Sequence, residues 1–349
     1  RRDGRASLLS NITTLEAIDA AIVEANPASL GRTYAGGSQL GEECERKLYY
    51  SFSWVMENSF PPRILRLFDR GHREEPALIG YLEAAGIEVK DLDPKTKEQF
   101  AVSFARGHGG GHFDGIMRGL PEAPDEWHIA EFKTANDKSF RSTKSKGVEI
   151  DKPVHFAQMQ IYMHLSEIKW AAYIVVNKND DDLYFERVPY NETVALQLLA
   201  RADRIISSNR PLEGISKDPS FFKCKWCDYQ PVCQLQKPPA VNCRTCAQVS
   251  VEDDGKWRCA KWKKEVPEDF MRKGCDKHLF NPNLLEDWAL PLEGDDDFIK
   301  FVNKKTGAEF VNGLGGYSSA EISATEDVGI IGDPAVDALK EKMDGRLIR

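Results

Sequence analysis

Apolar and polar residues follow two different periods along the first two thirds of the chain, which predicts a domain of mixed helices and strands. Stretches with apolar residues three or four positions apart predict helices, since such residues share one helix face. These stretches are an N-terminal segment to about residue 50, a helix broken at Gly71 over 61–86, and the segments 157–165 and 192–208. Short β-branched and aromatic stretches predict strands. These are 100–103, 113–118, 126–133, 170–177 and 183–188, of which the first three are expected to form a meander.

The pattern changes after the paired prolines 238–239, which predict a boundary. Beyond an acidic stretch at 293–297, the segment 298–312 alternates as a hairpin would, with a turn at 305–307, and a short helix is expected near the end. We therefore predict three parts, with boundaries at 1–237, 238–285 and 286–349. The fold class predicted for the first part is α/β, with a central mixed sheet flanked by helices.

Three short motifs in order along the first part carry the candidate chemistry. They are Asp114 after a glycine run, Glu131 and Lys133 in an acid-x-lysine strand, and Gln158 with Tyr162 on a helix. Carboxylates are the ligands that Mg²⁺ or Mn²⁺ prefers, and such an ion can acidify a bound water for phosphodiester hydrolysis. Side chains two apart on a strand face the same way, so Lys133 could orient that water beside Glu131.

This ordered set resembles the PD-(D/E)XK (restriction-endonuclease-like) nuclease superfamily, in the branch with the RecB-like nucleases, the CRISPR-associated four-cysteine exonucleases and lambda exonuclease. The resemblance covers roughly 32–233 and implies a helix, three strands, helix, strand order. It implies Asp114, Glu131, Lys133, Gln158 and Tyr162 as catalytic residues. The implied ligands of Mg²⁺ or Mn²⁺ are His72, Glu75, Asp114, Glu131 and Phe132. His72 follows one group of these families and Glu75 the other, so both stay open.

Eight cysteines divide into two sets, and without a secretory segment we interpret them as metal ligands rather than disulfides. One set is Cys44 with the distant trio Cys224, Cys227 and Cys233. This arrangement resembles the 4Fe-4S staple of the CRISPR-associated exonucleases and of related helicase-nucleases. Four thiolates can also hold Zn²⁺, so zinc remains the alternative. In either case the metal would connect Cys44 to the distant trio, and it would thereby close a long loop within the 1–237 domain.

The other set is Cys243, Cys246, Cys259 and Cys275, and it predicts a structural zinc site within a 238–285 zinc-binding module. His278, three residues further on, could replace Cys275 as the fourth ligand. The segment is too short and too polar to form a core unaided, which favours a metal over buried thiols.

The net charge of -8 is concentrated near the end of the chain, where residues 281–349 contain 7 Lys/Arg against 14 Asp/Glu. The rest is close to neutral and can still line a groove with cations. Candidates for contacting DNA phosphates are Lys138, Arg141, Lys144 and Lys146, in what we predict to be a loop. Arg32 and Ser38 are spaced as in the 5′-phosphate site of lambda exonuclease, although Ser38 could equally be a helix cap.

The resulting hypothesis is a metal-dependent DNA exonuclease of phage or bacterial origin, acting in recombination, repair or end processing. Its partners would be duplex ends or single strands, with a single-strand annealing or recombination protein as a further possibility. It would work in the cytoplasm of a bacterial host, without a membrane. Two alternatives stay open: a nuclease that trims spacers in CRISPR adaptation, and a scaffold that binds DNA or a partner without cutting it.

Overall fold

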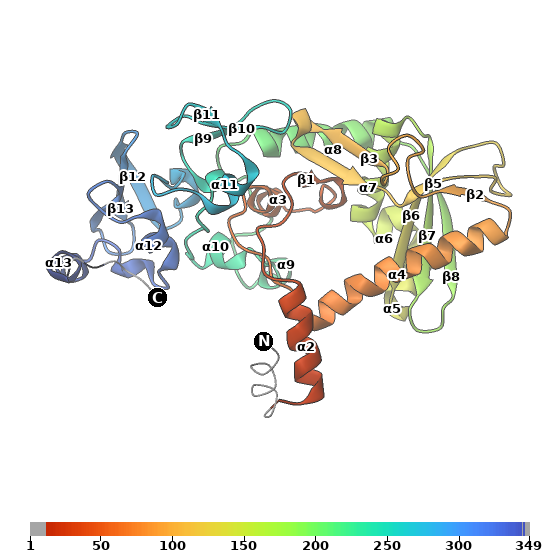
Figure 1. The fold of residues 1–349 in the computed structure, drawn as a ribbon, viewed down its shortest axis with the longest axis horizontal. Coiled ribbons are helices and arrows are strands. Elements are labelled where there is room, and N and C mark those ends of the chain that lie inside the picture. Colours follow the sequence, from red (N-terminus) through yellow and green to blue (C-terminus); the bar gives the residue numbers. More distant parts are fainter. Residues whose placement is uncertain (1–11, 344, 346–349) are drawn as a thin grey trace, which may run out of the picture.

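A five-stranded mixed sheet forms the centre of the first part of the chain in this computed structural model, which describes residues 12–343 and 345 (Figure 1). The strands run in the order β2-β5-β6-β7-β8, with β6 and β7 parallel and the other pairs antiparallel. Their bounds are β2 Glu88–Lys90, β5 Gly115–Arg118, β6 His128–Ala135, β7 Trp170–Asn177 and β8 Leu183–Pro189. The predicted α/β class is confirmed in this mixed form.

Helices cover both faces of this sheet because β6 and β7 carry apolar residues on both sides. Ala130 and Phe132 lie in one core cluster with Leu78 of helix α4 (Pro62–Ala84). Ile129 lies on the opposite face, in a second cluster with Phe140 of α5 (Asp137–Lys146) and with residues of α7 (Pro153–Ser166). Glu131 and Lys133 therefore share the α7 face of the strand, by the alternation of side chains.

The remaining helices of this part differ from the sequence prediction in two places. The N-terminal segment forms two helices rather than one, α2 (Thr14–Ala25) and α3 (Glu45–Phe52), separated by the short strand β1 (Ala35–Gly36) and the turn η2 (Gly37–Gln39). The break predicted at Gly71 is wrong, because α4 continues through it. The other helices are α6 Val148–Asp151, α8 Glu192–Ser207, α9 Phe222–Lys225 and α10 Gln230–Gln234.

A second sheet, in the order β1-β4-β3, contains the first strand of the predicted meander, whereas the other two strands, β5 and β6, pair antiparallel as predicted. Strand β3 (Ala101–Phe104) pairs with β4 (Gly109–His112), which is the glycine run and was not predicted as a strand. A side chain would not fit there: a Cβ at Gly111 would lie 2.2 Å from the Tyr162 hydroxyl oxygen, and one at Gly109 only 2.1 Å from the Phe104 ring. The glycines thus allow two aromatic rings to pack directly against the β4 backbone.

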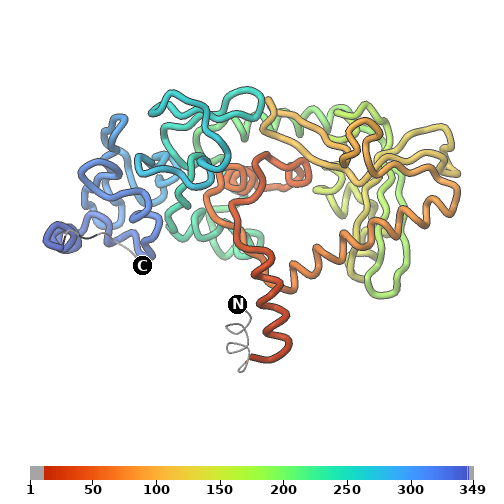
Figure 2. Tube along the Cα trace, in the orientation of Figure 1, coloured from red at the N-terminus to blue at the C-terminus, as the bar shows by residue number. Residues whose placement is uncertain are grey.

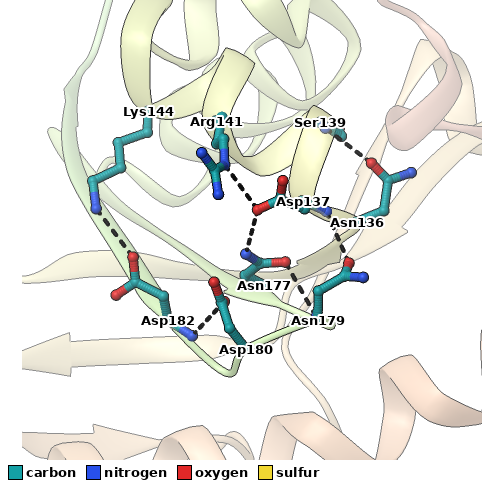
Figure 3. Close-up of polar contacts among 9 residues, drawn as sticks. All are labelled: Asn136, Asp137, Ser139, Arg141, Lys144, Asn177, Asn179, Asp180 and Asp182. Atoms are coloured by element: carbon teal, nitrogen blue, oxygen red, sulfur yellow. Dashed lines mark hydrogen bonds and ion pairs between the residues drawn. The ribbon is translucent and has the colours of Figure 1, made fainter.

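Helix α5 occupies the segment that we predicted as a basic loop. Asn136 caps its first turn by accepting a hydrogen bond from the Ser139 amide. Asp137 accepts hydrogen bonds from Arg141 and Asn177, which connects the helix to the turn between β7 and β8 (Figure 3). The loop prediction is wrong because the Ser, Lys and Arg composition hides this cap and the buried positions on the inner helix face.

The rest of the chain builds two smaller sheets at one end of the molecule (Figure 1). The first is β11-β10-β9, and the second is β12-β13-β14, which contains the predicted hairpin and packs against its own core around Phe301. Their strands are β9 Val249–Val251, β10 Trp257–Cys259, β11 Lys264–Glu265, β12 Ala289–Gly294, β13 Phe298–Asn303 and β14 Glu309–Gly313. The helices are α11 Glu268–Lys273, α12 Ser319–Ala324 and α13 Pro334–Met343, with short turns η3 Ala105–Gly107, η4 Cys243–Thr245, η5 Pro282–Leu284 and η6 Val328–Ile330. None of the described helices has the length and apolar character needed to cross a membrane.

Candidate active site

Glu131 is fully buried in the middle of β6, where an ionised carboxylate is costly unless other groups compensate it. Its Oε2 accepts a hydrogen bond of 3.0 Å from Nε2 of Gln158 on α7. Its Oε1 forms an ion pair with Nζ of Lys133, two residues along the same strand. Burial raises the pKa of Glu131 to about 7, and the nearby Asp114 adds to this effect while Lys133 opposes it.

Lys133 connects this buried carboxylate with the surface, since its side chain is 27% exposed. Its Nζ also donates to the Phe132 carbonyl oxygen at 3.1 Å. Burial opposes ionisation of the amine, but the carboxylates of Glu131 and Asp114 outweigh it and raise the pKa of Lys133. The amine is therefore held positively charged beside two carboxylates, where it can orient a water molecule.

Asp114 lies directly before β5, and its Oδ2 accepts a hydrogen bond of 2.7 Å from the Phe132 amide. This contact places the aspartate against β6 at the residue between Glu131 and Lys133. Phe132 thus contributes its backbone on both sides: the amide holds Asp114, and the carbonyl contacts Lys133. Its ring packs away from the carboxylates, in the core under α4.

The two ligand candidates on α4, His72 and Glu75, lie about one turn apart on this helix. Burial, followed by the negative charge of Asp114, raises the pKa of Glu75, and His72 and Lys133 oppose the shift. Glu75 is half-buried and His72 is exposed one turn earlier on the helix. Glu75 thus interacts electrostatically with Asp114, whereas His72 is more exposed to solvent.

Gln158 and Tyr162 lie one turn apart on α7 but have different surroundings. Gln158 contacts the Glu131 carboxylate directly. Tyr162 is 1% exposed, its ring lies 5.8 Å from that of Phe113, and a Cβ at either Gly37 or Gly111 would strike it. We interpret Gln158 as a residue that orients Glu131, and Tyr162 as the packing that joins η2 and β4 to the site.

A cleft of about 680 Å³ adjoins the site at Phe132 and Lys133, between α4 and the segment 31–40. Its α4 wall includes Phe60, Leu67, Phe68, His72 and Glu75, and Lys133 lies within it. Its opposite wall includes Arg32 and Ser38, whose Nη1 and Oγ atoms lie 3.4 Å apart. The pair that we considered for a terminal phosphate therefore faces the same cleft as Lys133.

The two cysteine sets are each gathered in space. Cys44, Cys224, Cys227 and Cys233 line a second pocket, of about 290 Å³. In the other set, burial and the neighbouring thiols Cys246, Cys275 and Cys259 raise the pKa of Cys243 to about 12. His278 is buried beside them, and its Nε2 lies 3.0 Å from the Asn242 carbonyl oxygen. Nowhere in residues 12–343 and 345 are three or more His, Cys, Asp or Glu side chains already disposed as a complete metal-binding group.

The basic residues of α5 are mostly paired within the protein. Lys144 and Asp182 are 3.1 Å apart, Arg141 and Asp137 are 2.9 Å apart (Figure 3), and Lys146 lies 3.8 Å from Asp151. The first two are exposed ion pairs, which contribute little to stability, whereas the Asp151 carboxylate of the third is nearly buried. Of the four candidates for contacting DNA, Lys138 is the remaining one, and it is exposed.

Sequence reasoning missed the residues that hold the Arg32 wall of the cleft. Arg272 of α11 donates to the Gly31 carbonyl, and Trp54 Nε1 donates to the Arg32 carbonyl at 2.8 Å. Arg244 donates to the Thr33 carbonyl. Two of these side chains, Arg244 and Arg272, belong to the cysteine-rich segment 243–275. This segment lies beside the chain after α2 (Figure 2). Arg244 lies between two cysteines in the sequence, and this position does not indicate that its side chain contacts the wall of the cleft.

Comparison with known proteins finds a weak similarity between this chain and a few solved structures. No family model and no curated protein matches the chain. Among solved structures, an alkaline exonuclease, LHK-Exo from Laribacter hongkongensis, is 16% identical with a TM-score of 0.36, over 54% of this chain and 90% of that one. The structure of the same enzyme in complex with dAMP is 15% identical with a TM-score of 0.38, over the same shares of the two chains. The structure of SSO0001 is 15% identical with a TM-score of 0.39, over 63% of this chain and 95% of that one.

Proposed function

We propose that the protein is a deoxyribonuclease that depends on Mg²⁺ or Mn²⁺ and degrades DNA from an end, in recombination, repair or end processing. The observation that supports this best is the arrangement around β6. Phe132 places Asp114 by its amide, Gln158 orients the buried Glu131, and Lys133 bridges from Glu131 to an open cleft. Carboxylates beside a charged amine at the base of a cleft suit hydrolysis of a phosphodiester.

The donor set fits a divalent cation of the Mg²⁺ type. Asp114 and Glu75 are hard oxygen donors, and Glu131 adds a buried carboxylate that Gln158 and Lys133 contact. Each of Glu75 and Glu131 has its pKa raised in part by Asp114, so these carboxyls repel one another when ionised. A cation held by Asp114, Glu131 and Glu75 would relieve this repulsion, and it would supply an acidified water and charge stabilisation at the phosphate.

Purified protein should therefore hydrolyse end-labelled linear DNA when Mg²⁺ or Mn²⁺ is added to a metal-free buffer. It should be inactive in the same buffer without them. The absence of hydrolysis of linear duplex and single strands with either ion would contradict the proposal and favour a scaffold that binds DNA without cutting it.

Arg32 provides a test of polarity. If Arg32 and Ser38 bind a terminal phosphate in the cleft, a duplex with a 5′ phosphate should be degraded faster than the same duplex with a 5′ hydroxyl. Arg32→Ala should remove the preference, at a cost of about tenfold or more in rate, because a charge-assisted contact contributes about 1.5 to 3 kcal/mol. Equal rates on both ends, or digestion only from 3′ ends, would instead leave Ser38 as a structural residue and favour the CRISPR-associated type.

The two cysteine sets are proposed to hold metals with structural roles. A 4Fe-4S cluster on Cys44, Cys224, Cys227 and Cys233, with zinc as the alternative, is supported by their common pocket. Zinc on Cys243, Cys246, Cys259 and Cys275 is supported by the mutual influence of these thiols on the pKa of Cys243.

We expect protein isolated without oxygen to be brown, with iron and sulfide and about one zinc per chain. Cys227→Ser should remove the iron and leave the zinc, and Cys259→Ser should do the reverse. Elemental analysis with absorption spectra measures both. Two zinc ions and no iron would replace the cluster by a second zinc site, and a metal-free folded protein would exclude both.

A further inference from the structure

The wall of the cleft formed by α4 carries aromatic rings that the chemistry of hydrolysis does not need. Phe60, just before the helix, and Phe68 within it are each 45% exposed and both line the cleft. Their rings contact each other edge to face, with centroids 5.2 Å apart. Leu67 beside them is 37% exposed. Exposed apolar surface of this kind in a cleft usually marks the place of a ligand.

Three cations lie in or beside the cleft, of which Lys178 lines it while Arg63 and Arg70 lie next to Lys178. Lys178, at the end of β7, lines the cleft, and the Lys178 carbonyl accepts a hydrogen bond from Arg70. Burial, and then the charges of Arg70 and Arg63, lower the pKa of Lys178, so these three cations lie within electrostatic reach of one another. Arg70 has an ion pair with Glu74 at 3.6 Å. Arg63 and Lys178 have no ion pair with any described residue.

Position along α4 relates these groups to the candidate metal site. Phe68, His72 and Glu75 follow one another at intervals of four and three residues, so they share one face of the helix. Phe68 therefore lies two turns before Glu75, the carboxylate that interacts with Asp114, and Phe60 lies further away, just before the helix begins. A strand whose phosphate reached Lys133 and Glu75 would place its neighbouring nucleotides at Phe68 and Phe60.

We infer that Phe60 and Phe68 bind unpaired nucleobases of the DNA strand that enters the cleft, while Arg63, Arg70 and Lys178 contact its phosphates. This inference rests on the proposed function. Aromatic rings beside cations are the arrangement by which proteins hold single strands, since every base has a face that can stack. The bases of an intact duplex are stacked on each other and present phosphates at the surface, which an exposed phenylalanine does not stabilise. The substrate end is therefore frayed or single-stranded when it is bound.

The test measures binding to full-length protein carrying Asp114→Asn, in buffer without Mg²⁺ or Mn²⁺. One DNA is a duplex with a short unpaired extension that carries 2-aminopurine, and the other is the same duplex with blunt ends. Phe68→Leu should weaken binding of the extended DNA about fivefold or more, since stacking on an aromatic ring contributes about 1 to 3 kcal/mol per base. It should also remove the quenching of 2-aminopurine, and it should leave the affinity for the blunt duplex within about twofold.

Two further variants make the outcome specific. Phe68→Trp should restore both affinity and quenching, because it restores a ring. Tyr81→Leu is the matched control, since Tyr81 is a 65% exposed aromatic residue on the same helix but outside the cleft, and it should change nothing. Equal effects of Phe68→Leu and Tyr81→Leu, or equal losses on both DNAs, would overturn the inference and leave the proposed function standing. If the Asp114→Asn protein without a further change bound neither DNA, the proposed function itself would fail.

Discussion

Replacing Glu131 by Gln is expected to lower the rate of DNA hydrolysis at least about 100-fold while the protein stays folded. Gln keeps the size of the side chain and can still contact Gln158, but it removes the negative charge that Lys133 and a cation need. Asp114→Asn and Lys133→Met should have effects of the same order, since each removes a donor or the amine that orients water. Initial rates on end-labelled DNA, with circular dichroism to confirm the fold, measure these losses.

Matched controls separate loss of the site from loss of charge in general. Glu149→Gln removes an exposed carboxylate on α6, and Asp125→Asn removes one that is 93% exposed, so both should keep normal rates. Gln158→Ala should have a smaller effect, about 10- to 100-fold, because it acts through the orientation of Glu131. A rate close to that of the unchanged protein for Asp114→Asn, Glu131→Gln or Lys133→Met would remove that residue from the active site.

The strand that carries Glu131 and Lys133 could be predicted from the sequence because its signals are local. Apolar residues on both sides of β6 indicate a buried strand, and the alternation of side chains brings the acid and the amine to one face. The proximity of Gln158 to Glu131 could not be worked out in this way. It depends on how α7 crosses the sheet, and in the sequence analysis it followed from a family resemblance.

The second sheet could not be predicted because two of its three strands, β1 and β4, lack the usual strand composition. Gly109, Gly110 and Gly111 have low strand propensity, and β1 is only two residues long. The pairing exists because Phe104 and Tyr162 fill the space where side chains would be. Helix α4 shows the opposite error: Gly71 suggested a break, but the helix continues through it and packs on the sheet with its C-terminal half, at Leu78, Ile79 and Leu82.

The paired acids and bases of α5 also depend on tertiary structure. Lys144 belongs to a helix, but its partner Asp182 belongs to the turn that leads into β8 (Figure 3). Composition alone indicated a cationic loop free to bind phosphate. Positive charge without an acidic partner lies instead at Arg63 and Lys178, which are far apart in the sequence and meet only when α4 packs across the end of β7.

Arg244 contacts residues that are far from it in the sequence, and these contacts extend from the cysteine-rich segment to the wall of the cleft. It is 6% exposed, and its guanidinium lies 3.7 Å from the ring centroid of Trp54 and 4.8 Å from that of Trp257. It donates to the carbonyl oxygens of Phe52 and Thr33. Burial, and then the charge of Arg272, lower the pKa of Arg244 to about 9, so the group remains charged at neutral pH inside an aromatic cage.

Arg244→Ala is therefore expected to lower the free energy of unfolding by about 3 kcal/mol or more, since it leaves two buried carbonyls unpaired and removes the cation between the rings. Arg258→Ala, an exposed change on β10 of the same segment, should cost no more than about 0.5 kcal/mol. Urea denaturation of both variants measures the difference. Because the Thr33 carbonyl adjoins Arg32, the folded fraction of Arg244→Ala should also show a higher KM for DNA at an unchanged kcat. A stability equal to that of Arg258→Ala would mean that the aromatic residues close over the gap, and that the cysteine-rich segment does not support the wall of the cleft.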